Sequence, residues 1–261
     1  MDFLLECIGF PPDTDLDALA ARVEREGEPV AWRDPDGLHR RLALADGLDL
    51  RLDRDEPRAA PALWPYFQSP HRLRVALEQL HGLPDQPYDM LMYGEANPAP
   101  PTHPELRGES WPLSCYLTDA RRLDRPLAAR HVIAVTIAGF ALDVGWIGPP
   151  TDATEAASAE LPYGARLRPL EREEEPGGCM DVSLRVRAVR HLVNPLTTVP
   201  FDLLECDAPG RPLQLFVSRW QLRADDLPVP RPGMRVEGVF VFTGRVAGGL
   251  PAPRLLRERF G

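Results

Sequence analysis

Apolar and polar residues alternate with two different periods near the start of the chain. Apolar positions between residues 16 and 23 recur at helical spacing, after Thr14, which suits an N-cap, and before Gly27. We expect a helix that Thr14 caps and that ends with Gly27 in the left-handed conformation. Leucines at residues 42–52 alternate on either side of Asp46-Gly47. This pattern predicts a β-hairpin with a tight turn.

A second amphipathic helix is expected between Ser69 and Gly82. Ser69 suits the N-cap and Pro70 the first helical position, and apolar residues follow at helical spacing until Gly82. Other segments have the composition of strands. The expected strands of this part are residues 3–8, 29–33, 88–93, 113–118, 131–138 and 141–147, the last two forming a hairpin or a continuous pair in a central sheet.

Two segments interrupt the regular pattern. Residues 94–112 contain five prolines and are expected to be a loop. Residues 148–178 are rich in Pro, Gly, Ala and acidic residues and end in an acidic run, Glu171 to Glu175, before Pro176-Gly177-Gly178. Because blocks of like charge stay solvated, we interpret this second segment as a linker.

The last third of the chain has the pattern of a small β-barrel. Residues 181–190 alternate cleanly, residues 201–206 and 213–217 are two further strands, and residues 219–227 fit a short helix. Residues 235–245 form a long strand that is partly apolar on both faces, and residues 254–260 could form a last one. This order of elements resembles an OB-fold barrel.

The sequence therefore predicts two domains. Residues 1–147 would form an α+β domain, a mixed sheet with two amphipathic helices. Residues 148–178 would be the linker, and residues 179–261 an all-β, OB-like barrel. The charge supports a boundary: of the net −9, residues 1–176 carry 18 Arg against 31 Asp and Glu, whereas residues 177–261 carry 12 against 8. Opposite signs favour docking of the two parts on each other.

The expected order of the first 55 residues, one strand, one helix and three strands, resembles one module of the vicinal-oxygen-chelate family. That family binds a metal through His and Glu at set strand positions. The resemblance leaves Glu6 and His39 as candidate ligands in this sequence. The alternative is a solvated Glu and a surface His, which we favour because single matches of this kind are often accidental.

The sequence contains no recognised catalytic motif. No Gly-x-Ser-x-Gly elbow and no paired histidine spacing are present, and all thirty basic residues are Arg, which excludes Schiff-base and Walker-type lysine chemistry. His103, near Glu105 and Glu109, is the best single acid–base candidate, although an exposed loop histidine is the favoured interpretation. The four cysteines are at least 27 residues apart and are expected to be buried, reduced thiols. We expect no metal and no cofactor.

The candidate binding residues lie on the predicted barrel: Arg185, Arg187, Phe216 and Trp220. Arginines that project outward beside exposed aromatic rings are what a groove for single-stranded nucleic acid needs, because bases stack on rings and guanidinium groups meet phosphates. The alternative is a solvated Arg face with an aromatic residue at a domain interface. We favour this alternative because a net charge of −9 repels polyanions. Trp64, Tyr66 and Phe67 form a second aromatic cluster, interpreted as packing.

The resulting hypothesis is a cytoplasmic bacterial protein that binds an unknown protein or small ligand without catalysing a reaction. The use of Arg without Lys and the 30 prolines indicate a GC-rich, bacterial source. No apolar run is long enough to span a membrane, which argues against a membrane partner. Two alternatives stay open: single-stranded nucleic-acid binding through the C-terminal barrel, and a metal-dependent enzyme sited in the N-terminal domain near Glu6, His39 or His103.

Overall fold

The computed structural model describes residues 2–30, 37–45, 47–54, 61–83, 86–99, 109–120, 123, 127, 130–150, 161, 164–170 and 177–248. The chain is mostly β. Its helices are α1 (Asp2–Glu6), α2 (Leu16–Glu26) and α4 (Arg219–Ala224). Its strands are β1 (Glu28–Pro29), β2 (Leu38–Ala45), β3 (Leu48–Arg54), β4 (Ala62–Phe67), β5 (Leu73–Leu83), β6 (Gln86–Ala96), β7 (Trp111–Leu117), β8 (Val132–Gly148), β9 (Arg166–Pro169), β10 (Cys179–Val193), β11 (Pro200–Asp207), β12 (Leu213–Val217) and β13 (Arg235–Gly248).

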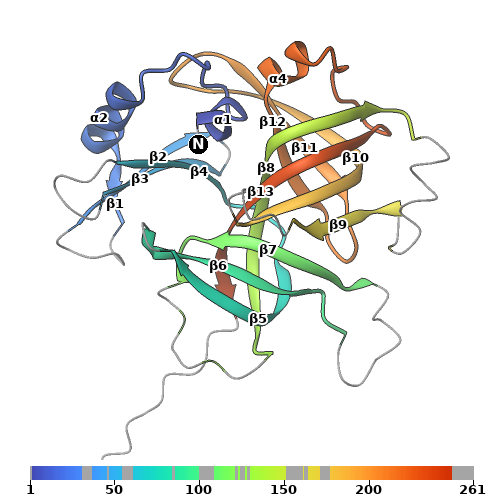
Figure 1. The fold of residues 1–261 in the computed structure, drawn as a ribbon. Helices are drawn as coiled ribbons and strands as arrows, with labels where there is room; N and C mark the ends of the chain where they lie inside the picture. The colour runs from blue at the N-terminus through green and yellow to red at the C-terminus, as the bar shows by residue number, and fades with distance from the viewer. Residues whose placement is uncertain are drawn as a thin grey trace, which may run out of the picture.

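Two long strands, β8 and β13, form the centre of the molecule (Figure 1). They pair antiparallel through thirteen residue pairs, from Arg235 opposite Gly148 to Gly248 opposite Ala134. Further pairings close a five-stranded ring on each side of this ladder. One ring is β8–β5–β6–β7–β13, and the other is β8–β12–β11–β10–β13. The two rings therefore share β8 and β13.

The two rings are built in the same way from two halves of the chain. In each half, three consecutive antiparallel strands precede one long strand: β5, β6 and β7 precede β8, and β10, β11 and β12 precede β13. The third short strand of each half pairs parallel with the long strand of the other half, β7 with β13 and β12 with β8. Each half thus closes its ring with a strand from the other half.

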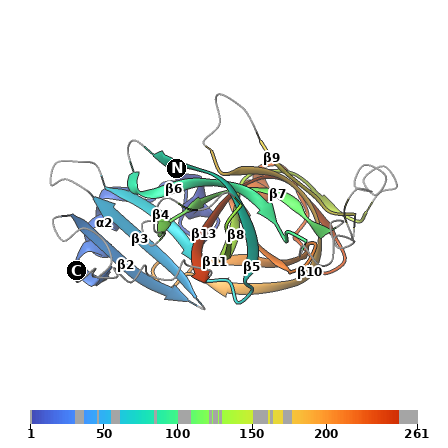
Figure 2. The same cartoon turned by 90° about the horizontal axis from the view of Figure 1, so that it is seen from below.

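A separate four-stranded sheet, in the order β1-β2-β3-β4, lies beside the rings (Figure 2). Successive side chains of a strand point to opposite faces. One face carries the buried Leu48, Leu50 and Leu52 of β3, and α2 packs on β2 and β3 with its own buried apolar side chains. The other face carries polar side chains and is turned toward the rings, since Arg51 donates a hydrogen bond to the Thr118 carbonyl.

Several local predictions are confirmed and their details corrected. The helix at residues 16–26 is present, but Asp15 rather than Thr14 is the N-cap, accepting a hydrogen bond from the amide of Ala18 at 3.0 Å. Gly27 follows it with φ −74°, so the expected left-handed conformation is wrong. The hairpin of β2 and β3 is confirmed, with Leu42 opposite Leu50.

Two element types were predicted wrongly. Residues 2–6 form α1 instead of a strand, and residues 73–83 form β5 instead of a helix. In β5, Leu73, Val75 and Leu77 are buried at a period of two, and pairing with both β6 and β8 leaves Ala76 buried as well. Because this strand has apolar residues on both faces, their spacing also fits a helix. The pairing with β6 and β8 makes the segment a strand.

The expected two-domain division and the OB-like barrel of residues 179–261 are not confirmed. Strands from both sides of the proposed boundary pair within one nine-stranded mixed sheet, since β13 pairs with β8 and β7, and β12 with β8. Inside the proposed linker, β9 pairs with β10. The expected loop at residues 94–112 is wrong at both ends, because residues 94–96 belong to β6 and residues 111–112 to β7. Residues 100–108, the acidic run Glu171 to Glu175 and the segment 254–260 lie outside the described residues.

The shared ladder makes Gly238 a sensitive position. A Cβ at Gly238 would lie 2.2 Å from the carbonyl oxygen of Asp143. We expect Gly238→Ala to lower the free energy of unfolding by about 1–3 kcal/mol, because backbone atoms must then move in a ladder that both rings use. Gly145→Ala is the matched control, since no heavy atom lies within 4 Å of its Cβ. Equal losses for both variants in urea unfolding would contradict this account.

Candidate functional site

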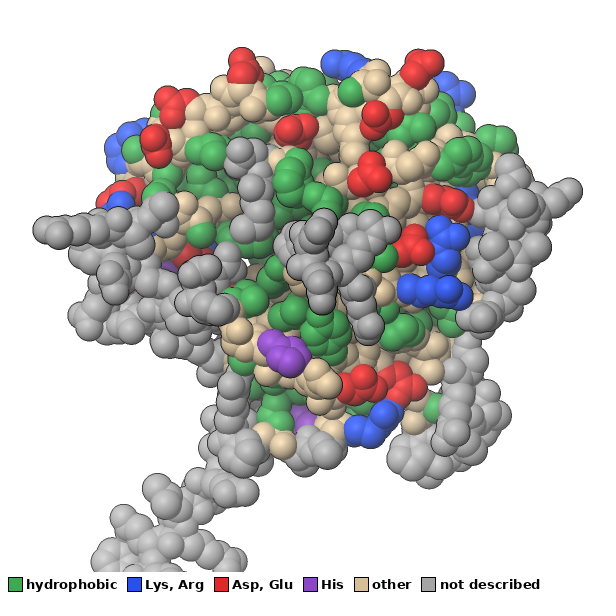
Figure 3. Space-filling view, in the orientation of Figure 1, with side chains coloured by type: hydrophobic (Ala, Val, Ile, Leu, Met, Phe, Trp, Pro, Cys, Tyr) green, Lys and Arg blue, Asp and Glu red, His purple; other side chains and the backbone are tan. Residues whose placement is uncertain are grey.

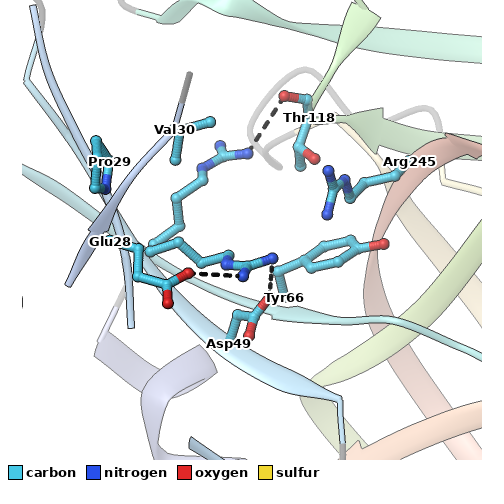
Figure 4. Close-up of a pocket in the computed structure, with 9 residues that line it drawn as sticks. Glu28, Pro29, Val30, Asp49, Tyr66, Thr118 and Arg245 are labelled. Atoms are coloured by element: carbon cyan, nitrogen blue, oxygen red, sulfur yellow. Dashed lines mark hydrogen bonds and ion pairs between the residues drawn. The ribbon is translucent and has the colours of Figure 1, made fainter. Parts of the chain in front are cut away.

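A cleft lies between the polar face of the four-stranded sheet and the part of the larger sheet formed by β8, β13 and the end of β7 (Figure 4). Figure 4 shows Glu28 and Pro29 of β1 on one side and Thr118 and Arg245 on the other. Tyr66 of β4 lies next to Arg245. This first cavity has a volume of about 280 Å³. The residues that line it come from segments that are far apart in the sequence.

A second cavity of about 480 Å³ adjoins the first and shares Arg41, Tyr66 and Arg245 with it. It adds Arg72, from the segment before β5, and Thr136 of β8. Among the described residues that line it, none is acidic. Its volume falls within the range of roughly 300–1,000 Å³ that is typical of small-molecule sites.

The β8–β13 ladder positions Arg245. Arg245 pairs with Thr136, so both side chains emerge on the same face, toward β4. The Tyr66 hydroxyl lies 3.2 Å from Thr136 Oγ1, and the Arg245 guanidinium lies 5.2 Å from the centroid of the Tyr66 ring. Burial raises the pKa of Tyr66 to about 12, so the phenol stays neutral at physiological pH. The neutral ring and its hydrogen bond hold Arg245 at the edge of both cavities.

Arg51 forms the buried base of the first cavity. Its Nε lies 2.5 Å from Asp53 Oδ2, its Nη2 donates to Asp89 Oδ2 at 2.5 Å, and its Nη1 donates to the Thr118 carbonyl at 3.3 Å. Burial favours the neutral form of Arg51, but the charges of Asp89 and Asp53 outweigh it and raise the pKa of the guanidinium. Asp53 also contacts His39 Nδ1 at 2.8 Å. This network ties β3 to β6 and to the end of β7.

Arg41 is flanked by the two carboxylates of the first cavity. Its Nη2 donates to Glu28 Oε2 at 3.1 Å, and its Nη1 lies 3.7 Å from Asp49 Oδ2. Asp49 is only 8% exposed, and burial raises its pKa although Arg41 and Arg245 act in the opposite direction. The ion pair with Arg41 thus compensates the desolvation of Asp49 incompletely.

The positive charges of two guanidinium groups in the cleft, Arg72 and Arg245, are only weakly balanced by nearby carboxylates. Arg72 is exposed and forms no ion pair or hydrogen bond with the described part of the chain. Arg245 has a carboxylate contact with Asp119, at 4.0 Å. An Arg presents several donors in a planar fork that matches carboxylate and phosphate. The cleft is therefore suited to an anion.

The candidate nucleic-acid residues are not brought together. Arg185 and Arg187 are exposed on β10, but Phe216 is fully buried and stacks on Phe140, with ring centroids 4.9 Å apart. The expectation that Phe216 projects outward is wrong. Trp220 is half-buried on α4, next to Arg219, which contacts His191.

The spacing along β10 separates the remaining candidates. His191 follows Arg185 by six residues on this strand, which corresponds to about 20 Å at roughly 3.3 Å per residue. Of the two aromatic residues in the predicted set, Phe216 is buried and Trp220 is half-buried, so neither offers an exposed ring beside Arg185 and Arg187.

The predicted metal ligands are also separated. Glu6 accepts a hydrogen bond from Ser218 at 3.2 Å, whereas His39 is 5% exposed and contacts Asp53, so the expected surface histidine is wrong. Within the described ranges, no group of three or more His, Cys, Asp or Glu side chains could hold a metal ion. The vicinal-oxygen-chelate order fails at its first element, which is a helix. His103 and Glu105 lie outside the described residues.

All four cysteines are buried and free of disulfides, as expected. Cys7 Sγ donates to the Ala141 carbonyl at 3.3 Å. Burial raises the pKa of Cys7 to about 12 and raises the pKa values of Cys115 and Cys206 as well. Thiols that stay protonated and covered are unreactive, so they serve packing.

Sequence reasoning missed Arg41, Asp49, Arg72 and Arg245 and interpreted Tyr66 only as packing. One signal was present: in β3, Asp49, Arg51 and Asp53 alternate with leucines, which defines a charged face opposite the leucine face. Such a face is ordinarily solvated, and nothing local in the sequence shows that a second sheet covers it.

Comparisons with protein-family models, with curated protein sequences and with solved structures give no match to this chain. In the described part of the chain, no helix is both long enough and apolar enough to cross a membrane.

Arg51→Ala tests the buried ion network. It leaves the carboxylates of Asp53 and Asp89 buried without their guanidinium, and we expect a loss of about 3–5 kcal/mol in the free energy of unfolding. Arg187→Ala is the matched control. The Arg187 side chain is 60% exposed and lies 3.7 Å from Glu205, so its loss should stay below about 1 kcal/mol. Similar losses for the two variants in denaturant titrations would show that Arg51 does not hold the sheet to the rings.

Asp49→Asn tests the desolvated carboxylate. Because the folded state raises the pKa of Asp49 above its ordinary value of 3.8, the native protein binds this proton more tightly than the unfolded chain. The free energy of unfolding therefore falls as the pH rises from 3.8 through the raised pKa, because the buried carboxylate becomes ionised. We expect Asp49→Asn to be more stable than the parent at pH 7, with a difference that shrinks as the pH falls toward 3.5. Urea titrations across this range check it, and a variant less stable at pH 7 contradicts it.

Proposed function

We propose that the protein binds a small anionic ligand in the cleft between the four-stranded sheet and the rings, and that it acts as a binding module without catalysis. One observation carries the proposal. The cavity of about 480 Å³ is lined by Arg41, Arg72 and Arg245, and none of its described lining residues is acidic.

The charge distribution supports this choice. The chain has a net charge of −9, and on the face shown in Figure 3 acidic side chains are spread widely, with Arg side chains beside several of them. Three arginines around one cavity are thus a local reversal of the overall charge. Guanidinium groups at a partly enclosed site bind carboxylate or phosphate through charge-assisted hydrogen bonds.

The cleft is also preorganised. Arg245 is held over the Tyr66 ring, and Arg41 lies between Glu28 and Asp49. Side chains whose positions are already fixed lose less conformational entropy when a ligand binds. Arg72 is the exception, because it is exposed, and it is the side chain that we expect to close on the anion.

We also propose that each ring is an OB-like barrel that is completed by the other half of the chain. Three consecutive strands, a parallel contact to the closing strand and, in the second ring, α4 between β12 and β13 support this proposal. The OB-like unit would then extend beyond residues 179–261, because β8 supplies its closing strand.

Arg72→Gln is the direct test of anion binding. Binding of inorganic phosphate, measured by isothermal titration calorimetry at low salt, should weaken about tenfold or more. A hydrogen bond to a charged group contributes about 1.5–3 kcal/mol. Arg185→Gln removes the same charge from the exposed face of β10, outside the cleft, and should change the affinity less than twofold.

Three results would count against the proposal. The first is no binding of phosphate, sulfate or citrate at low salt. The second is an equal effect of Arg72→Gln and Arg185→Gln. The third is binding of a single-stranded oligonucleotide that Arg187→Glu abolishes and Arg72→Gln leaves intact, which would favour the nucleic-acid alternative.

A further inference from the structure

The two cavities of the cleft differ in charge. The cavity of about 280 Å³ contains Glu28 and Asp49, whereas the cavity of about 480 Å³ has no acidic residue in its described lining. Arg41, Tyr66 and Arg245 line both, so the cavities adjoin. A ligand that fills both meets guanidinium groups at one end and carboxylates at the other.

The volume shows that an inorganic anion is too small for the whole cleft. One water molecule takes a share of roughly 30 Å³ in the liquid, and the larger cavity alone is about 480 Å³. A single phosphate or sulfate ion would leave most of this space to water. The cleft has room for an organic group attached to the anion.

The charge count indicates a dianion. Arg41 is already flanked by Glu28 and Asp49, at 3.1 and 3.7 Å, which leaves Arg72 and Arg245 as the least compensated guanidinium groups. A phosphate monoester carries about −1.5 to −2 charge at pH 7 and three acceptor oxygens. It matches two guanidinium groups better than a monocarboxylate does.

The carboxylate end indicates neutral hydrogen-bond donors. Asp49 is 8% exposed and its desolvation is incompletely compensated, so a further donor would stabilise its charged form. An ammonium group placed there would also meet the guanidinium groups of Arg41 and Arg51, which line the same cavity. Hydroxyl groups donate without adding positive charge.

We infer that the ligand is a phosphate monoester of a polyhydroxylated, sugar-like molecule. Its phosphate lies between Arg72 and Arg245 in the larger cavity, and its hydroxyl groups donate to Asp49 in the smaller one. This inference rests on the proposed anion-binding function and adds the chemical class of the ligand. Asp49 and Arg72 thereby have separable roles, one for the hydroxyl groups and one for the phosphate.

Calorimetry with five probes tests this assignment: inorganic phosphate, glycerol 3-phosphate, ribose 5-phosphate, glucose 6-phosphate and unphosphorylated ribose. At least one sugar or polyol phosphate should bind about tenfold or more tightly than inorganic phosphate, since hydroxyl groups that donate to a carboxylate form charge-assisted hydrogen bonds. Ribose itself should show no binding.

Two variants separate the two ends. Asp49→Ala should remove the preference for the sugar phosphate while inorganic phosphate binds equally or more tightly, because a nearby negative charge is lost. Arg72→Gln should weaken both probes by a similar factor. Arg185→Gln, outside the cleft, is the control for a change of net charge.

The failures are distinguishable. If inorganic phosphate binds as tightly as every sugar phosphate, or if Asp49→Ala leaves the preference intact, the ligand class is wrong and anion binding stands. If citrate binds more tightly than all phosphates, the phosphate assignment is wrong. If no anion binds at low salt, both the inference and the proposed function are wrong.

Discussion

The antiparallel ladder between β8 and β13 is the interaction on which the rest of the fold depends. Its thirteen residue pairs belong to both rings at once, and its phenylalanines Phe140, Phe240 and Phe242 are fully buried. The same ladder places Arg245 and Thr136 on its outer face, where Tyr66 and the four-stranded sheet meet it. The backbone hydrogen bonds between β8 and β13 therefore hold both rings together and also position Arg245 and Thr136 at the candidate site.

The second constraint is that the four-stranded sheet is covered on both faces. Its leucine face packs under α2, and its charged face meets the rings, where Arg51 contacts Thr118 and Asp89. Buried charges are tolerated only when they are paired. Arg51 satisfies this condition with Asp53 and Asp89, whereas Asp49 satisfies it only in part. The cleft lies where the side chains of the two sheets do not fill the space between them.

Local patterns predicted the elements whose partners are near in the sequence. The α2 helix, the β2–β3 hairpin and the alternating strand β10 were found from spacing and turn residues. β5 was mistaken for a helix because a central strand with two apolar faces lacks a clear period of two. Ring closure and the cleft could not be predicted, since Arg41, Arg72 and Arg245 meet only through long-range strand pairing.

The exchange of long strands between the halves also has a consequence for synthesis on the ribosome. The strands β5 to β8 are complete at residue 148, but their ring closes only with β13, which begins at residue 235. At about 5–20 residues per second, the roughly 90 intervening residues take on the order of 5–20 s. Throughout that time β7 and β8 have unpaired edges. The nascent first half is therefore the stage of synthesis at which this chain is most exposed to aggregation and most dependent on chaperones.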